Sequence, residues 1–188
     1  MDKCLLVCYT LFETYESIGE AMPISFLPKV ITPKLTDLTP EFLKSKQIEL
    51  LMMDFDNTIV PYTCNQPTQE MELWLRKMAH GDIKICVVSN SKRDRVKVFC
   101  RQYGIPCITH AAKPFPKGIR QCLNQFGIPA EHAALVGDQI FTDTLGGNGA
   151  GVTTILVEAI DNHNFWLKAR HVLELPFIYL AKNRRMKP

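Results

Sequence analysis

Short runs of consecutive apolar residues recur along the chain from residue 48 onward, and polar stretches separate them. Continuous apolar runs of this length are typical of strands that are buried on both faces of a parallel sheet. The predicted strands cover residues 48–55, 83–89, 105–109, 133–138 and 153–157. The segments between them are long enough for helices, so the pattern predicts an α/β fold built from right-handed β-α-β units.

The first intervening segment, residues 67–81, has the spacing of an amphipathic helix. Met71, Trp74, Leu75 and Met78 recur at three- and four-residue intervals, which predicts that they form the buried face of this helix. Pro67 lies near its first turn and Gly81 follows its last, as is usual at helix ends.

Two further helices are predicted from their ends. Ser91 and Asp94 have the three-residue spacing of a capping box, and Gly104 is expected to end the helix that they open. The next helix is expected to start at Pro116 and to end at Gly127.

A glycine-rich segment, "GGNGAG" at 146–151, follows a short helical stretch predicted from Thr142. A dinucleotide-binding loop is one interpretation of such glycines, but that loop joins a strand to a helix. Here the order is reversed, because the segment leads into a strand. We therefore expect the glycines to break the helix and form a tight turn.

Polar side chains gather where the predicted strands end. Parallel strands place their carboxyl ends at one edge of the sheet, where ligands of such folds bind. Asp54 and Asp56 lie at the end of the first predicted strand, and Ser89 and Asn90 lie at the end of the second. Lys113 lies just beyond the third strand. Asp138 ends the fourth strand, and Asp143 follows it. Each of these residues alone is an ordinary loop residue, and only their shared edge indicates a site.

Four carboxylates at one edge repel one another unless a cation lies among them. Oxygen ligands favour a hard cation, and Mg²⁺ takes carboxylates, waters and a substrate phosphate. A calcium loop over "DFDNTI" is the competing interpretation. It fails because Ile59 occupies the position of the required glycine and Asn65 that of the required glutamate.

The same stretches carry a family resemblance. Asp54–Thr58, Ser89–Asn90, Lys113–Pro114 and Gly137–Asp143 resemble, in order, the four motifs of the haloacid dehalogenase-like (HAD) hydrolase superfamily. Within it, the chain resembles the YqeG branch of the class IIIA phosphatases over about residues 23–185, and this branch is similar to phosphatidylglycerophosphate phosphatases. The resemblance implies a three-layer Rossmann-like HAD fold with a central parallel sheet and no cap domain.

The resemblance also implies a role for each residue. Asp54 would attack phosphorus and form an aspartyl-phosphate, and Asp56 would act as the general acid and then as the general base. Lys113 would offset negative charge. The phosphate would be bound by Thr58, Ser89, Asn90 and Lys113, and Mg²⁺ by Asp54, the backbone carbonyl of Asp56, Asp138 and Asp143.

The expected activity is Mg²⁺-dependent hydrolysis of a phosphomonoester. A catalytically silent phosphate-binding or regulatory domain is the alternative from another class, although no motif residue is damaged. A dehalogenase would not need Asp56, and a mutase normally needs a cap.

The spacing of the motifs bears on substrate size. One helix and one strand fill the gap from Thr58 to Ser89, and the same holds from Ser89 to Lys113, so neither gap has room for a cap. An open site suits a phosphate carried on something large, such as phosphatidylglycerophosphate at a membrane, unless an oligomer covers the site. The basic segment 182–187 and the pair Phe165–Trp166 could assist membrane contact; a solvated tail and a core-facing pair are the simpler alternatives.

Composition narrows the remaining choices. A net charge of +3 is too small to indicate a nucleic-acid partner, and no apolar run approaches the length of a membrane span. The seven cysteines form no C-x-x-C pair, which favours reduced thiols in a cytoplasmic enzyme, placed peripherally at the inner face of the membrane if the substrate is a lipid. Residues 1–21 are expected to be a non-native leader or disordered extension, and 22–188 a single domain.

Overall fold

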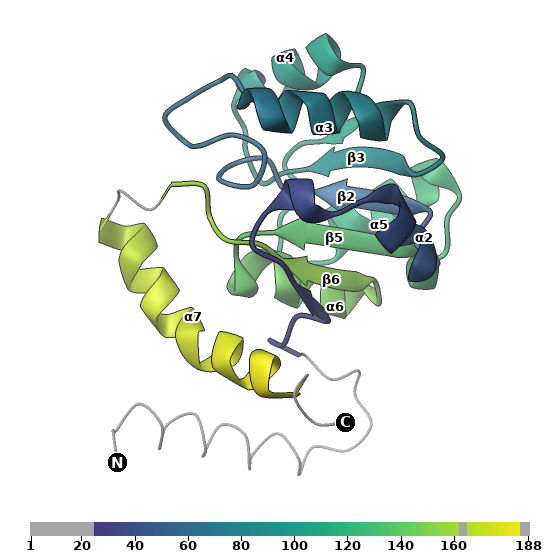
Figure 1. Cartoon of the computed structure of the whole chain (residues 1–188). Helices are drawn as coiled ribbons and strands as arrows, with labels where there is room; N and C mark the ends of the chain where they lie inside the picture. The colour runs from purple at the N-terminus through teal and green to yellow at the C-terminus, as the bar shows by residue number, and fades with distance from the viewer. Residues whose placement is uncertain (1–24, 162–164, 185–188) are drawn as a thin grey trace, which may run out of the picture.

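A computed structural model of the chain describes residues 25–161 and 165–184, and its centre is a six-stranded sheet (Figure 1). All adjacent strands pair in parallel, in the order β1-β6-β5-β2-β3-β4. The strands are β1 (Val30–Ile31), β2 (Leu50–Met53), β3 (Lys84–Val88), β4 (Cys107–Ile108), β5 (Ala133–Gly137) and β6 (Thr153–Leu156). The five predicted strands are confirmed.

Helices connect these strands and cover the sheet. The α-helices are α2 (Pro40–Ser45), α3 (Gln69–Ala79), α4 (Asp94–Tyr103), α5 (Lys117–Phe126), α6 (Leu145–Ala150) and α7 (Phe165–Arg184). Shorter helical turns are η1 (Leu35–Asp37), η2 (Ala130–His132) and η3 (Ile140–Thr144), of which η3 is a π-helical turn.

Alternation along β2 produces the predicted three layers. Successive residues of a strand point to opposite faces. Leu51 and Met53 join one buried cluster with the apolar faces of α3 and α4, and Leu50 and Met52 join a second cluster with the buried face of α5. The sheet is therefore covered on both faces, which is why its strands are apolar throughout.

The strand order places a topological switch point beside β2. From β2 the chain proceeds outward to β3 and β4, then returns to β5 on the other side of β2. Residues 54 and 138 therefore leave neighbouring strands, because Met53 is in register with Val136. Ligands of open α/β sheets bind at such a point.

The connections contain no cap domain within the described residues. Between β2 and β3 the only helix is α3, and between β3 and β4 the only helix is α4. The carboxyl edge of the sheet is consequently not covered by an inserted domain in this part of the chain.

The start of α4 differs from the prediction. The helix begins at Asp94, and its N-cap is Arg93, so Ser91 and Asp94 do not form a capping box. Ser91 lies too early in the chain: its Oγ accepts a hydrogen bond from the backbone N–H of Arg93 at 3.2 Å and shapes the preceding loop instead.

The glycine-rich segment also differs. Gly146, Gly147 and Gly149 lie inside α6, and the helix ends only at Gly151, where φ is +82°. A Cβ on Gly147 would lie 2.5 Å from Cγ2 of Thr154, so this glycine serves close helix–strand packing. The sequence analysis predicted that these glycines break the helix, whereas Gly147 is needed inside the helix because only a small residue fits there.

The sixth strand, β1, was not predicted. Val30 pairs with Ile155 of β6 at the edge of the sheet, but two residues are too few to produce a hydrophobic pattern. No helix in the described part of the chain is both long and apolar enough to cross a membrane. The expectation for residues 1–21 lies outside the described residues, as do the side chains of Phe165 and Trp166 and most of the basic segment 182–187.

Candidate active site

Asp54 is the first residue beyond β2, at the carboxyl edge of the sheet. Its backbone N–H donates to the carbonyl of Val136 at 2.9 Å, which ties it to the neighbouring strand. The next residue, Phe55, is fully buried and packs edge-on against Phe99 with a ring separation of 5.1 Å. This alternation turns Asp54 and Asp56 away from the core while Phe55 anchors the turn between them.

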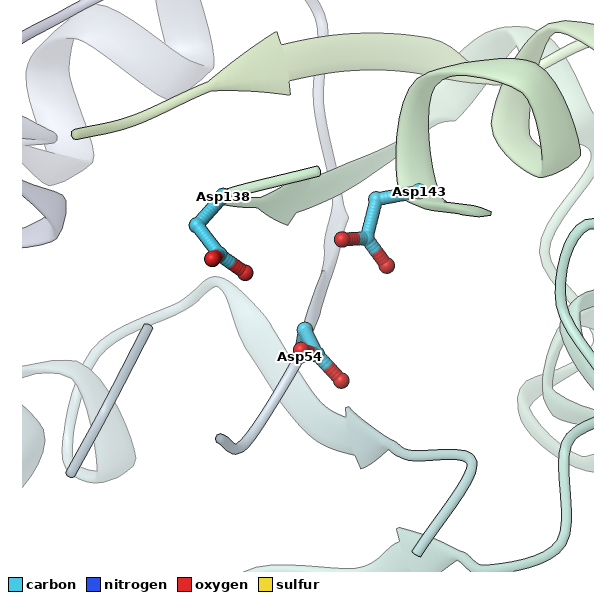
Figure 2. Close-up of side chains that lie close together, drawn as sticks. All are labelled: Asp54, Asp138 and Asp143. Carbon is cyan, nitrogen blue, oxygen red and sulfur yellow. The ribbon is translucent and has the colours of Figure 1, made fainter. Parts of the chain in front are cut away.

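Asp138 and Asp143 come from the segment after β5. The π-helical turn η3 begins at Ile140 and brings Asp143 back over the end of the strand, where its Oδ2 accepts from the backbone N–H of Gln139 at 3.2 Å. Carboxylate oxygens of Asp54, Asp138 and Asp143 lie within 4.8 Å of one another, and all three residues are buried. Figure 2 shows the three carboxylates turned toward a common space.

Gly137, the last residue of β5, allows this approach. A Cβ atom on Gly137 would lie 2.7 Å from the Cβ of Asp143 and closer still to its carboxylate. Real Cβ atoms do not come so near to other carbons, so Asp143 can occupy its position only because residue 137 has no side chain.

The Lys113 ammonium lies among these acids. Its Nζ is 2.7 Å from Oδ1 of Asp54, 2.7 Å from Oδ1 of Asp143 and 2.7 Å from the carbonyl of Val88. Burial opposes its charge, but the two carboxylates outweigh burial and raise the pKa of Lys113. Burial also raises the pKa of Asp143, and the positive charge of Lys113 offsets part of this increase. Three carboxylates facing one ammonium leave a net negative charge when all are ionised, which a divalent cation would balance.

Asn90 fixes the loop that carries Lys113. Its Nδ2 donates to the Lys113 carbonyl at 2.8 Å, and its Oδ1 accepts from the Lys113 backbone N–H at 2.7 Å. The preceding Ser89 is buried, and its Oγ accepts from the Ser91 N–H at 3.1 Å. The Asn90 side chain thus has a supporting role that the sequence did not indicate.

Asp56 is paired with a cation that the sequence analysis missed. Nη2 of Arg95 lies 3.3 Å from Oδ1 of Asp56, and the guanidinium carbon lies 5.1 Å from the centre of the Phe55 ring. Arg95 also donates to the carbonyls of Pro61, Tyr62 and Cys64. Burial raises the pKa of Asp56, and Arg95 acts in the opposite direction. Only the fold brings Arg95, the second residue of α4, back to this loop.

The turn after Asp56 is rigidly bonded. Asn57 has a φ of +63°, and its Nδ2 donates to the carbonyl of Asp161 at 2.6 Å, which links the first motif to the segment after β6. Thr58 is buried, and its Oγ1 has no hydrogen-bond partner among the described residues. A buried hydroxyl in this state fits a role in binding a ligand oxygen.

The sequence of this chain is similar to those of known proteins. The HAD-hydrolase-like family matches residues 110–162, which include Lys113, Asp138 and Asp143. The probable phosphatase YqeG of Bacillus subtilis is 36% identical over 132 residues, which cover 70% of this chain and 77% of the relative. This chain belongs to the YqeG family of HAD-type phosphatases.

Two more distant proteins are also similar to this chain. Phosphatidylglycerophosphate phosphatase 1, chloroplastic/mitochondrial, of Arabidopsis thaliana is 28% identical to this YqeG-family chain over 174 residues, covering 86% of the chain and 50% of that protein. The crystal structure of a hypothetical protein from Xanthomonas campestris has a TM-score of 0.51 at 14% identity, covering 74% of this chain and 79% of that one. This last likeness supports the fold alone.

One contact in this YqeG-family chain connects the C-terminal helix to the site. Glu174 of α7 is buried, and its Oε1 accepts a hydrogen bond from the backbone N–H of Ile140 at 3.0 Å. Ile140 lies between Asp138 and Asp143. Phe177 packs against Phe141 of the same turn with a ring separation of 6.1 Å, so α7 supports the segment that carries two of the three acids.

The predicted site residues therefore divide into two groups. Asp54, Asp138, Asp143 and Lys113 lie in direct contact or within a few ångströms of one another. The others, Asp56, Thr58, Ser89 and Asn90, lie on the adjoining loops at the same edge of the sheet. Arg95, Gly137 and Glu174 were not predicted. Only the Gly137 position within a recognised motif gave a signal that could have been used.

Proposed function

We propose that this chain is a Mg²⁺-dependent phosphomonoesterase that acts through an aspartyl-phosphate at Asp54. One observation carries the proposal. Carboxylate oxygens of Asp54, Asp138 and Asp143 lie within 4.8 Å of one another, beside the buried ammonium of Lys113. Buried acids of this density need positive charge, and their oxygen ligands favour a hard divalent cation.

The residues present fit such a cation. Asp54, Asp138 and Asp143 would hold Mg²⁺ together with the backbone carbonyl of Asp56. Bound Mg²⁺ would neutralise charge on the transferring phosphoryl group and orient it. Lys113 would supply further positive charge next to the nucleophile and keep Asp54 in position.

The first step places Asp54 as the nucleophile and Asp56 as the acid. The Asp54 carboxylate forms a bond to phosphorus while the bond from phosphorus to the ester oxygen breaks. Asp56 gives its proton to the departing oxygen, which leaves as an alcohol. Burial raises the pKa of Asp56, which favours a carboxyl group that carries a proton to give.

The second step uses the same two residues. Asp56, now ionised, takes a proton from water as the water oxygen attacks phosphorus, and the acyl-phosphate bond to Asp54 breaks. Inorganic phosphate and the original carboxylate result. In both steps the hydroxyls of Thr58 and Ser89, the backbone N–H of Asn90 and the ammonium of Lys113 would bind phosphate oxygens, because these donors belong to residues at the same edge of the sheet.

Phosphate release from p-nitrophenyl phosphate tests this proposal. We expect turnover with Mg²⁺, none with EDTA, and recovery when Mg²⁺ is restored. Asp54→Asn removes the nucleophile with almost no change of volume, so it should abolish turnover while the protein stays folded; Asp82→Asn, at an exposed position far from the site, is the matched control.

Two results would count against the mechanism. Near-normal turnover by Asp54→Asn would exclude a covalent intermediate on that residue. Mg²⁺ binding without any turnover by the unmodified chain, over a broad range of phosphate esters, would favour the catalytically silent alternative.

For the substrate, we propose a phosphate ester carried on a large or lipid group, with phosphatidylglycerophosphate as the first candidate. The name of the Arabidopsis relative and the absence of a cap between β2 and β4 support this choice. A cytoplasmic enzyme associated peripherally with the membrane would follow. Comparing kcat/KM on the lipid in mixed micelles with sugar phosphates and mononucleotides tests it. Efficient hydrolysis of a soluble metabolite alone would contradict it and direct attention to an oligomer that covers the site.

A further inference from the structure

Most of the exposed large apolar side chains lie either on segments next to the candidate active site or on helix α7. Nine large apolar residues are exposed in the described part of the chain, and only Leu73 on α3 and Val98 on α4 lie elsewhere. The remaining seven are Tyr62, Phe115, Ile160, Leu173, Leu175, Tyr179 and Leu180. Scattered single apolar residues are normal on the surface of a soluble protein, whereas a group of neighbouring exposed apolar residues is typical of an interaction surface.

Three of the seven come from segments that adjoin the candidate active site. Tyr62 contacts the side chain of Gln139, the residue after Asp138, through its hydroxyl at 3.5 Å. Phe115, 71% exposed, lies two residues after Lys113. Ile160 donates its backbone N–H to the carbonyl of Asn57 in the first motif. The rim of the open site therefore carries aromatic and aliphatic groups that face solvent.

The other four lie on α7. Leu173 and Leu175 flank Glu174, which faces the molecule and contacts η3, and Tyr179 and Leu180 are exposed one to two turns further along. Figure 1 shows that α7 begins on the side toward which the strands point. Between residues 173 and 180, the exposed side chains of α7 are thus apolar, although Glu174 and Phe177 of the same segment already pack against the domain.

Positive charge accompanies this apolar surface. The sequence from residue 165 to the C-terminus contains six lysines and arginines and a single acidic residue, Glu174, which is buried. Around the rim, Lys92, Arg93, Lys117 and Arg120 are exposed, against Asp94 and Glu158. Apolar groups next to basic ones match the interface of an anionic membrane.

We propose that the outer face of α7 and the rim residues Tyr62, Phe115 and Ile160 bind an anionic lipid bilayer. The helix lies in the interface, and the open site faces the lipid headgroups. The inference rests on the proposed function only in its choice of a lipid-borne substrate; binding itself requires no catalysis. A second copy of the chain is a poorer occupant, because pairing two copies through α7 would bring two strongly basic segments together.

Co-sedimentation with vesicles tests the proposal on the full-length chain. We expect binding to vesicles of phosphatidylcholine containing phosphatidylglycerol, much weaker binding to phosphatidylcholine alone, and a decline with added salt. The double variant Leu173→Gln/Leu180→Gln should lower the partition coefficient about tenfold, because it removes two apolar side chains from the contact. Leu73→Gln is the matched control, since Leu73 and Leu173 are exposed to 62% and 61% and only Leu173 lies on α7.

Activity and mass measurements separate the outcomes. Turnover of p-nitrophenyl phosphate should be the same in the double variant, the control and the unmodified chain, and Asp54→Asn should bind vesicles normally. Vesicle binding that the double variant leaves intact, or that Leu73→Gln weakens equally, would overturn the proposal. A second result would also overturn it: the unmodified chain does not bind vesicles but forms a dimer in light scattering, and the double variant is a monomer. In that case α7 would bind a second copy of the chain. If the unmodified chain binds vesicles as expected but shows no turnover, the result counts against the proposed phosphatase mechanism and not against membrane binding.

Discussion

At the scale of the residue, the position of Asp143 depends on Gly137. A methyl group on Gly137 would overlap the Asp143 side chain, so Gly137→Ala must displace one of the three clustered carboxylates. We expect the Mg²⁺ concentration for half-maximal activity to rise roughly tenfold to a hundredfold, the range for lost support of a metal ligand. A Mg²⁺ titration of turnover measures this.

Gly149→Ala is the control for that substitution. Gly149 lies in α6, and no atom outside the adjoining backbone of its own helix lies within 4 Å of the position that the alanine methyl group would take, so the change should leave the Mg²⁺ requirement unaltered. An unchanged titration in Gly137→Ala would mean that Asp143 is not needed where it lies.

Arg95 links the pKa of Asp56 to catalysis. Burial raises this pKa and Arg95 is the largest influence that lowers it, so the pKa of Asp56 should rise further in Arg95→Met, where only Arg93 and Lys113 still lower it. Asp56 must be ionised to act as a base in the second step. The acid limb of the pH profile of kcat should therefore move to higher pH, while thermal unfolding reports any loss of folding.

Arg101→Met serves as the comparison, because Arg101 lies on the same helix and its side chain donates to the Lys97 carbonyl, away from Asp56. Its pH profile should match that of the unmodified chain. An Arg95→Met profile with an unmoved acid limb would show that Arg95 supports the loop of Pro61 to Cys64 without affecting Asp56.

At the scale of the element, α7 acts on the site through Glu174. Glu174→Leu leaves the Ile140 N–H buried without its acceptor, which costs about 1–3 kcal/mol and loosens the turn between Asp138 and Asp143. We expect weaker Mg²⁺ activation in this variant and substantial recovery in Glu174→Gln, whose amide oxygen can still accept. Isothermal titration with Mg²⁺ and chemical unfolding separate the two effects. Equal loss in both variants would argue against a hydrogen-bonding role.

The elements that sequence patterns predicted well are those with long or repeated signals. The strand before Asp54 was found because its apolar residues form a continuous run, and the helix of Trp74 and Met78 because its apolar residues recur at helical spacing. Strand β1 was missed because two residues carry no period. The glycines of α6 were misinterpreted because a helix that must pack closely and a helix that must end both require glycine.

The site shows the same limit. Asp54, Lys113, Asp138 and Asp143 were predicted to share an edge, because parallel strands deliver whatever follows them to the same side. Arg95 and Glu174 reach the site from within helices, and their spacing from the motifs has no fixed meaning in the sequence. Residues that position others through tertiary contacts are therefore harder to predict than residues that act directly.

At the scale of the whole molecule, the thiols of the described residues lie apart from the proposed catalytic residues. Cys86, Cys100 and Cys122 are buried. A hydrogen bond with Cys122 and burial raise the pKa of Cys86, and burial raises that of Cys100, so both stay protonated and unreactive. Iodoacetamide should label the exposed Cys64 and leave turnover intact, as followed by mass spectrometry and phosphate release. Loss of turnover in a protein that remains folded would implicate a cysteine in the reaction.

The common direction of the strands has a practical consequence at the opposite end of the molecule. The amino ends of the strands meet turns such as Gly81–Asp82 and Gly127–Pro129, which contain exposed residues and no member of the site. Loop tips of this kind tolerate added chain better than the elements that they join. An affinity handle or a fluorophore attached there would hold the protein on a support with its carboxylates directed outward, at a distance set by the length of the strands.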